Sequence, residues 1–448
     1  MVHTFKCLDR FFAIDVESGS VFEIDELTKE LIDCDNSPLD ISKGVFSVYS
    51  QDEIKEAREE VKSLIERNVL FSPEPEHNPP VYSGVVKALC LNISHNCSLR
   101  CEYCFADGGS YSGERMNMSK EVALKAIDFL VARSGSRRNL EVDFFGGEPL
   151  LNMDVVKETV KYARSIEGRH GKNFRFTITT NAYALSDEDI EFFNKEMYNV
   201  VLSIDGRKDV HNRVRKTAGG QDSFDKIVEN ALRFRKSRWD KQYYIRGTFT
   251  SFNKDFATDA LYLNDLGFDQ ISLEPVVLPQ SHRLAISEQD VPQLVEQYEI
   301  LAKEYIERRK TEKWFNFFHF MIDVSGGPCE SKRLVGCGAG NEYLAISPDG
   351  KIYPCHQFDG KPDYVIGNVL TGEFDDRLPK IFASANLTTK PECMKCWAKY
   401  YCSGGCSANS VNFCGDIHKP YTITCSLMKK RVECAIAIKA IEAAQQEK

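Results

Sequence analysis

The sequence has no long apolar run and no excess of basic residues. Its 448 residues include 57 Lys and Arg against 66 Asp and Glu, which gives a formal net charge of −9. This acidic balance argues against a general nucleic-acid binder, and the lack of a continuous apolar stretch argues against a membrane-spanning helix. The opening Met1–Phe5 has no signal-peptide character, so we expect a cytoplasmic protein without nucleic-acid or membrane partners.

Cysteine is absent from more than 220 consecutive residues between Cys104 and Cys329, although the chain has 16 cysteines. Most of them fall in two blocks, Cys97–Cys104 and Cys329–Cys434. Cysteines in a reducing compartment seldom form structural disulfides, so iron–sulfur clusters or metals are the expected use, with a secreted disulfide protein as the alternative. The cysteine-free gap is where a catalytic domain is expected.

Apolar, β-rich runs alternate with helical periodicity through this gap. The helical segments include Lys120–Val131, Val155–Ile166 and Phe224–Arg235. The β-rich runs are Ala88–Ser94, Leu140–Phe145, Phe174–Thr179, Val200–Asp205, Tyr243–Phe249 and Gln270–Pro275. Repeated βα units predict an α/β fold. Six units fit an open, partial (β/α)6 barrel with its chemistry at the carboxyl ends of the strands.

Three cysteines, Cys97, Cys101 and Cys104, directly follow the first predicted strand. A closed [4Fe–4S] cluster takes four thiolates, so three leave one iron free for another ligand. Zinc or plain thiols are the alternatives. The Cys-x3-Cys-x2-Cys run, followed by Phe105, resembles the cluster loop of the radical S-adenosylmethionine (SAM) superfamily. The resemblance implies that the free iron holds the amino and carboxylate groups of SAM.

The same resemblance assigns SAM contacts at the other strand ends. It places the methionyl amino group at Gly146–Pro149, which lies 42 residues after Cys104. Arg215 pairs with the methionyl carboxylate, and Arg213 is the alternative for that role. Hydroxyl, amide and carboxylate groups at the ends of the third and fourth predicted strands can form hydrogen bonds with the ribose of SAM. The full implied set is Phe105, Gly146, Gly147, Glu148, Pro149, Thr180, Asn181, Ser203, Asp205 and Arg215. By sequence alone, the groups beyond Gly146–Pro149 fit ordinary turn or barrel positions equally well.

The C-terminal cysteines form a second pattern. It consists of Cys337, Cys355, Cys393, Cys396, Cys402, Cys406 and Cys425, and it resembles the seven-cysteine SPASM domain. That family carries two auxiliary [4Fe–4S] clusters, whereas zinc is the alternative for Cys-x2-Cys pairs. Ligation as in the family assigns Cys393, Cys396, Cys402 and Cys425 to the distal cluster. It assigns Cys337, Cys355 and Cys406 to the cluster nearer the active site. A β-hairpin over Tyr343–Pro354 is expected to position Cys355.

The fourth ligand of the nearer cluster stays open between two possibilities. Cys329 can close the cluster as an electron relay, or a substrate thiolate can bind the open iron. Cys414 and Cys434 fall outside the pattern. Three further cysteines are expected to be small buried residues, namely Cys7, Cys34 and Cys90.

The N-terminal residues predict a small separate domain. Short strands are expected before residue 26, helices over Glu26–Ile32 and Asp52–Arg67, and a Pro-rich linker over Ser72–Pro80. The segment resembles the winged-helix peptide-binding domain of peptide maturases, which takes a leader peptide as an added strand. A structural cap is the alternative. We therefore expect domains over 1–80 (leader binding and linker), 81–280 (barrel), 281–336 (bridge) and 337–448 (SPASM).

Together these features resemble the thioether-forming maturases of six-cysteine (SCIFF) peptides, supported by Phe11–Val16 and Cys337–Gly340. The resemblance implies three [4Fe–4S] clusters, SAM, a leader-bearing precursor peptide, a flavodoxin or ferredoxin-like electron donor and an anaerobic setting. A 5′-deoxyadenosyl radical would remove hydrogen from a substrate carbon, which a cysteine sulfur then joins. One alternative is an anaerobic sulfatase maturase, although His356 stands where that family has Asp. Another is a non-catalytic electron-transfer protein.

Overall fold

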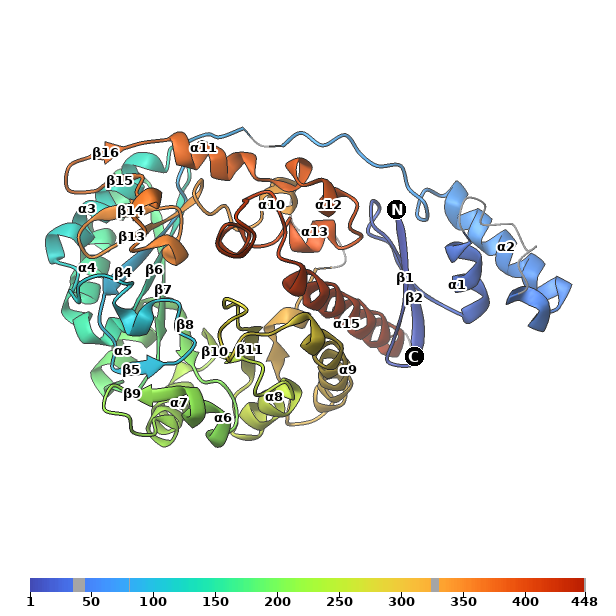
Figure 1. Ribbon diagram of the computed structural model, residues 1–448, viewed down its shortest axis with the longest axis horizontal. Coiled ribbons are helices and arrows are strands. Elements are labelled where there is room, and N and C mark those ends of the chain that lie inside the picture. Colours follow the sequence, from blue (N-terminus) through green and yellow to red (C-terminus); the bar gives the residue numbers. More distant parts are fainter. Residues whose placement is uncertain (35–44, 80, 324–329, 447–448) are drawn as a thin grey trace.

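The computed structural model describes residues 1–34, 45–79, 81–323 and 330–446. An open ring of strands and helices lies on one side of the molecule, and a small N-terminal unit lies on the opposite side (Figure 1). The C-terminal segment lies between them and contacts both.

Six parallel strands form the centre of one long sheet, in the spatial order β11-β10-β8-β7-β6-β4. They are β4 (Ala88–Ser94), β6 (Asn139–Gly146), β7 (Asn173–Thr180), β8 (Met197–Ser203), β10 (Gln242–Phe249) and β11 (Gln270–Pro275). This confirms the predicted α/β fold with six βα units. One prediction was wrong at its ends: β8 begins at Met197 and ends at Ser203, so Asp205 lies in the following loop.

The sheet extends beyond these six strands at both edges. β12 (Asn316–Phe317) adds to β11 in parallel, and β13 (Tyr343–Ile346) adds to β4 in parallel. Antiparallel pairing then continues through β14 (Lys351–Tyr353), β15 (Gly367–Asn368) and β16 (Glu373–Phe374). The predicted hairpin over Tyr343–Pro354 is therefore present, and it is continuous with the barrel sheet.

Helices cover the outer face of the parallel strands (Figure 1). They are α3 (Lys120–Arg133), α4 (Met153–His170), α5 (Asp187–Glu196), α6 (Lys208–Val214), α7 (Phe224–Arg238), α8 (Phe256–Asp265) and α9 (Val291–Arg308). Ser119 begins α3 by accepting a hydrogen bond from Val122 N. Alternate strand residues such as Leu91, Val142 and Phe176 are fully buried against these helices. The other strand face is left to line the barrel interior.

The N-terminal unit is an antiparallel sheet of β1 (Val2–Cys7), β2 (Arg10–Asp15) and β3 (Val21–Ile24), followed by α1 (Glu26–Asp33) and α2 (Gln51–Glu66). Ser50 and Glu53 form a capping box at the start of α2. Ile54, Ala57 and Val61 are the buried residues of α2. An extended segment over residues 72–79 and 81–87 then crosses to β4 (Figure 1).

The C-terminal segment is built from short helices and one long one. They are α10 (Glu330–Val335), α11 (Arg377–Ser384), α12 (Pro391–Met394), α13 (Lys399–Cys402), α14 (Ser407–Asn409) and α15 (Thr422–Gln446). α15 packs against α9 and also contacts β1 and β3. The first strand and the last helix of the chain are therefore in contact (Figure 1). None of the helices in the described ranges is both long and apolar enough to cross a membrane.

Candidate active site and cysteine clusters

The loop that carries Cys97, Cys101 and Cys104 is held by a two-stranded ribbon. β5 (Leu99–Cys101) pairs antiparallel with β9 (Arg215–Thr217), and this register places Cys101 opposite Arg215. Arg100 Nη1 donates to the carbonyls of Cys97 at 2.6 Å and Leu99 at 2.7 Å. The backbone of the cysteine loop is thereby fixed beside the carboxyl end of β4.

The three thiols are free and lie close enough to influence one another. The pKa of Cys97 is raised to about 11 and that of Cys101 to about 12. Burial is the main cause of both shifts, and the charge of a Cys104 thiolate contributes to both, after that of Glu148 in the case of Cys97. Arg215 opposes these shifts. Three half-buried thiols that repel one another as thiolates need a cation to stay ionised together, and iron supplies one.

Within the described residues, no group of three or more His, Cys, Asp or Glu side chains is arranged to hold a single metal ion. A four-iron cluster has a different requirement, because each thiolate binds its own iron and the sulfurs need not converge on one point. The donor set of the cysteine loop therefore fits a cluster better than a mononuclear zinc site.

Gly146 and Gly147 bring the end of β6 against the start of the cysteine loop. Gly147 N donates to Ser94 O at 2.7 Å, and Glu148 N donates to Asn96 O at 2.9 Å. A Cβ added at Gly147 would lie 2.3 Å from Asn96 O, and Gly146 has a φ of +118°. Only glycine permits this approach of two backbones.

Glu148 connects two strand ends from a buried position. Its Oε1 accepts hydrogen bonds from Thr180 Oγ1 at 2.6 Å and Leu150 N at 3.0 Å, and its Oε2 accepts one from Asn181 N at 2.8 Å. Burial raises the pKa of Glu148, although these hydrogen bonds oppose the shift. Asn181 Nδ2 in turn donates to Ser98 Oγ at 3.1 Å. The expected SAM residues at the ends of β6 and β7 thus form one network with the cysteine loop.

Asp205, Tyr103 and Arg215 form a second buried group beside the same loop. Tyr103 Oη donates to Asp205 Oδ2 at 2.7 Å and accepts from Arg215 Nη1 at 2.7 Å, while Arg215 and Asp205 lie 3.6 Å apart. Burial works against the charge of Arg215, but Cys101, Tyr103 and Asp205 hold its pKa above the usual range. Arg215 Nε is buried and has no hydrogen-bond partner in the described structure. This unused donor fits a bound carboxylate.

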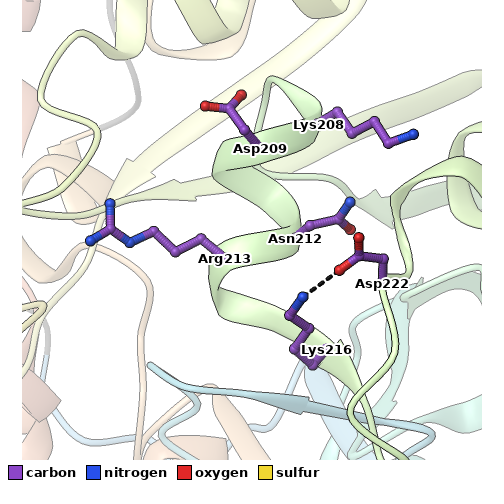
Figure 2. A pocket seen from close by; sticks show the side chains of 6 residues that line it. All are labelled: Lys208, Asp209, Asn212, Arg213, Lys216 and Asp222. Atoms are coloured by element: carbon purple, nitrogen blue, oxygen red, sulfur yellow. Dashed lines mark hydrogen bonds and ion pairs between the residues drawn. The ribbon is translucent and has the colours of Figure 1, made fainter.

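Arg213 takes a different position. It is exposed on α6, and its guanidinium stacks 3.8 Å from the ring centroid of Phe252. Figure 2 shows it extending away from Lys208 at the rim of an outer pocket. Of the two arginines considered for the methionyl carboxylate, the structure brings Arg215 to the cysteine loop.

The cysteines of the C-terminal segment gather in two groups. Cys425 on α15 lies close enough to Cys393, Cys396 and Cys402 for their negative charges to raise the pKa of its thiol. Burial is the larger cause, and the pKa is about 12. Cys355 is in range of Cys337 and Cys406, and burial raises its pKa to about 12 as well. These are the two ligand sets implied by the SPASM resemblance, except that Cys329 lies outside the described residues.

The remaining described cysteines are not members of these two sets, although Cys90 lies in the same buried cluster as Cys355. Cys7 and Cys434 are buried with their sulfurs 3.9 Å apart, and buried Cys90 lies 3.8 Å from Asn92 Oδ1. Cys414 Sγ lies 3.7 Å from Pro420 O. Cys34 is half-buried, which corrects the expectation that it is buried.

Comparison with known proteins agrees with both cysteine patterns. Residues 91–250 match the Radical SAM superfamily, and residues 337–407 match SPASM, an iron-sulfur cluster-binding domain. The chain has a radical SAM domain and a C-terminal SPASM domain. These domains imply SAM and [4Fe–4S] clusters as cofactors.

Several known proteins resemble most of the chain. A cysteine-type anaerobic sulfatase-maturating enzyme from Clostridium novyi (strain NT) is 24% identical over 72% of this chain and 89% of its own. The radical SAM cyclopropyl synthase TigE from Paramaledivibacter caminithermalis is 24% identical over 81% of this chain and 74% of its own.

Two solved structures share the fold. Native anSMEcpe with bound AdoMet has a TM-score of 0.65 at 20% identity and covers 81% of this chain and 100% of its own. Streptococcus suis SuiB bound to precursor peptide SuiA has a TM-score of 0.54 at 19% identity and covers 92% of this chain and 95% of its own. The radical SAM and SPASM architecture is therefore shared by both structures.

Phe105 and His356 connect the radical SAM loop to the SPASM domain. Phe105 directly follows Cys104, and His356 directly follows Cys355, yet their ring centroids lie 5.5 Å apart. Phe145 contacts His356 at 5.0 Å. Burial lowers the pKa of His356 to about 4, so its imidazole is neutral near pH 7. The side chains beside the two cysteine sites therefore meet inside the barrel.

The sequence did not single out the polar residues that line the barrel interior. Glu274 on β11 pairs with His319 at 3.2 Å and with Arg431 of α15 at 3.4 Å. Burial opposes ionisation of Glu274, but His319 and Arg431 hold its pKa well below its usual range. Asp143 on β6 has a pKa raised to about 7 by burial and by Glu141. Strand alternation is the only sequence signal for such inward positions.

The other two expected SAM residues occupy strand-end positions. Ser203 is the last residue of β8 and is half-buried. Pro149 is buried and begins the turn after Glu148. Both lie at the same end of the sheet as the cysteine loop, since the strands are parallel.

Proposed function

We propose that this radical SAM and SPASM protein installs thioether crosslinks in a ribosomally made, cysteine-rich precursor peptide. The observation that carries the proposal is the 5.5 Å contact between the rings of Phe105 and His356. These residues directly follow Cys104 of the radical SAM loop and Cys355 of the nearer auxiliary group. A substrate bound beside this contact would present one residue to each site.

The bound cofactors would supply a 5′-deoxyadenosyl radical at the cysteine loop and an open iron for a substrate thiolate at the nearer auxiliary site. The chain's own residues orient these groups. Arg215 offers its Nε to the methionyl carboxylate, and Gly146 and Gly147 let backbone atoms approach the amino group. The rings of Phe105 and Phe145 stack 6.4 Å apart and give the site an apolar surface, against which a bound substrate would exclude water from the reacting carbon.

The N-terminal unit is an argument for a peptide as the substrate. In the described residues β3 pairs only with β2, so its outer edge has free N–H and C=O groups that an extended leader can use. The unit is fixed to the SPASM domain, because His3 stacks on Trp397 at 4.0 Å and Glu17 pairs with buried Lys399 at 2.8 Å. A bound leader would therefore be held at a set distance from the barrel.

The match to sulfatase-maturating enzymes favours a second candidate, formylglycine formation on a protein Cys or Ser. The neutral His356 imidazole can accept a proton in such a reaction. The two candidates make different products, since a thioether keeps the cysteine sulfur and formylglycine loses it.

The test uses the anaerobically reconstituted enzyme, SAM, a reductant and a cysteine-rich peptide offered with and without a leader. Thioether formation removes two hydrogens per bridge and leaves a product that thiol reductants do not reverse. We expect this product only from the leader-bearing peptide. Sulfur loss would support formylglycine formation instead, and unchanged peptide accompanied by 5′-deoxyadenosine would exclude this substrate class.

A further inference from the structure

Lys390 is an exception among the buried lysines of the described chain. Lys399 pairs with Glu17 and Glu74, and Lys430 pairs with Glu299 and Glu433. Lys390 is only 1% exposed, yet no carboxylate among the described side chains pairs with it. Its Nζ donates to the carbonyl of Gly404 at 2.8 Å. A buried ammonium with one neutral partner needs a negative charge from elsewhere.

The nearest source of negative charge is the cysteine groups. The thiolates of Cys393, Cys402 and Cys425, from the distal group, act on the Lys390 ammonium, and so does Cys406 from the nearer group. The lysine therefore faces both groups at once.

The backbone around Lys390 is shaped to hold it there. Its carbonyl accepts hydrogen bonds from Cys393 N at 2.9 Å and Met394 N at 3.0 Å, which ties it to the first Cys-x2-Cys turn. Gly404 lies on the stretch between Cys402 and Cys406 with a φ of +81°. A Cβ there would lie 3.2 Å from Lys390 Cδ. The turn that joins the two cysteine groups thus packs on the lysine's aliphatic stem.

We propose that Lys390 is the shared counter-ion of the two auxiliary clusters and favours their reduced states. Each cluster gains one negative charge when it accepts one electron, so a fixed positive charge beside it raises its reduction potential. A charge between the two clusters also lessens their mutual repulsion. This inference deepens the proposed function, in which closing the C–S bond releases an electron that must be accepted.

The test compares reduction potentials rather than product. In the full chain carrying Cys97→Ala, Cys101→Ala and Cys104→Ala, only the auxiliary clusters remain to be titrated. Lys390→Met removes the charge at similar volume, and Lys390→Arg keeps it. Lys395→Met is the matched control, because Lys395 lies within the same Cys-x2-Cys turn but is exposed to solvent.

Anaerobic redox titration followed by electron paramagnetic resonance should show a lower midpoint for Lys390→Met than for the Lys395→Met control. Lys390→Arg should restore the midpoint. Because no peptide is present, this result is independent of whether the enzyme makes thioethers.

If Lys390→Met does not assemble its clusters, the iron content of the variants is compared instead. Loss of iron in Lys390→Met with full iron in Lys390→Arg would support the counter-ion role. Equal loss in both variants would show that side-chain shape matters and overturn the proposal. An unchanged midpoint in fully loaded Lys390→Met would overturn it as well.

Discussion

Lys399→Met is expected to release the N-terminal unit from the SPASM domain. The Lys399 side chain is fully buried and that of Glu17 is 2% exposed, with Nζ and Oε1 2.8 Å apart. After the substitution, the Glu17 carboxylate stays buried with a 2.7 Å hydrogen bond from Tyr400 as its described side-chain contact. Removing one partner of a buried ion pair costs roughly 3–5 kcal/mol.

This cost weakens docking because the two charges come from different units. A change of that size corresponds to a shift on the order of a hundredfold to several thousandfold in the docking equilibrium. The assay is limited chymotrypsin proteolysis under native conditions, read at Tyr400. This tyrosine is buried and hydrogen-bonded to Glu17 in the docked state, so cleavage there reports the undocked fraction. We expect Lys399→Met to be cleaved much faster than the wild type.

Two further variants make the result specific. Lys399→Met combined with Glu17→Gln removes both charges, so cleavage should slow again toward the wild-type rate. Lys380→Met removes an exposed lysine of α11 that pairs with Asp376, and this substitution should leave cleavage unchanged. Wild-type cleavage in Lys399→Met would refute the reasoning, and so would a double variant cleaved as fast as the single one.

Three other outcomes follow from the site. Replacing Cys97, Cys101 and Cys104 together by Ala should abolish SAM cleavage but leave iron on the SPASM domain; retained 5′-deoxyadenosine release would contradict the assignment. Gly147→Ala should reduce SAM affinity at least tenfold in equilibrium binding, because its Cβ would meet Asn96 O at 2.3 Å; unaltered affinity would argue against the close approach. Asp143 has a pKa raised to about 7, so ionising it costs stability as pH rises from about 4 toward 7. Asp143→Asn should therefore be more stable than the wild type to denaturant at pH 8 and lose this advantage by pH 4; an equal difference at both pH values would count against the buried carboxyl.

The strands were predictable because each is a short apolar run between helical segments. β4 and β11 have the predicted bounds, whereas β8 is shifted because Met197–Asn199 continues the strand toward α5. The hairpin that precedes Cys355 was also predictable from its Pro-Asp-Gly turn. That it extends the barrel sheet through β4 was not, because strand partners distant in sequence leave no local signal.

The cysteines and glycines of the site could be predicted from their spacing in the sequence, but the side chains that hold them in place could not. Tyr103 lies between Cys101 and Cys104, and nothing in that run indicates that its hydroxyl joins Asp205 to Arg215. Likewise, nothing in the local sequence indicates that Lys390, which precedes a Cys-x2-Cys pair, is buried. Its burial depends on Gly404, which comes near it only through the fold. Contacts of this kind arise from tertiary packing rather than from periodicity.

Mass spectrometry of the product peptide shows whether the proposed bond between a peptide cysteine sulfur and carbon is formed. The reduced, iron-loaded enzyme is incubated anaerobically with SAM and a leader-bearing cysteine peptide, and the fragments are sequenced. We expect the loss of two hydrogens per bridge, retention of every sulfur, resistance to thiol reductants and release of 5′-deoxyadenosine. Sulfur loss with a new aldehyde, or 5′-deoxyadenosine with an unchanged peptide, would contradict this expectation.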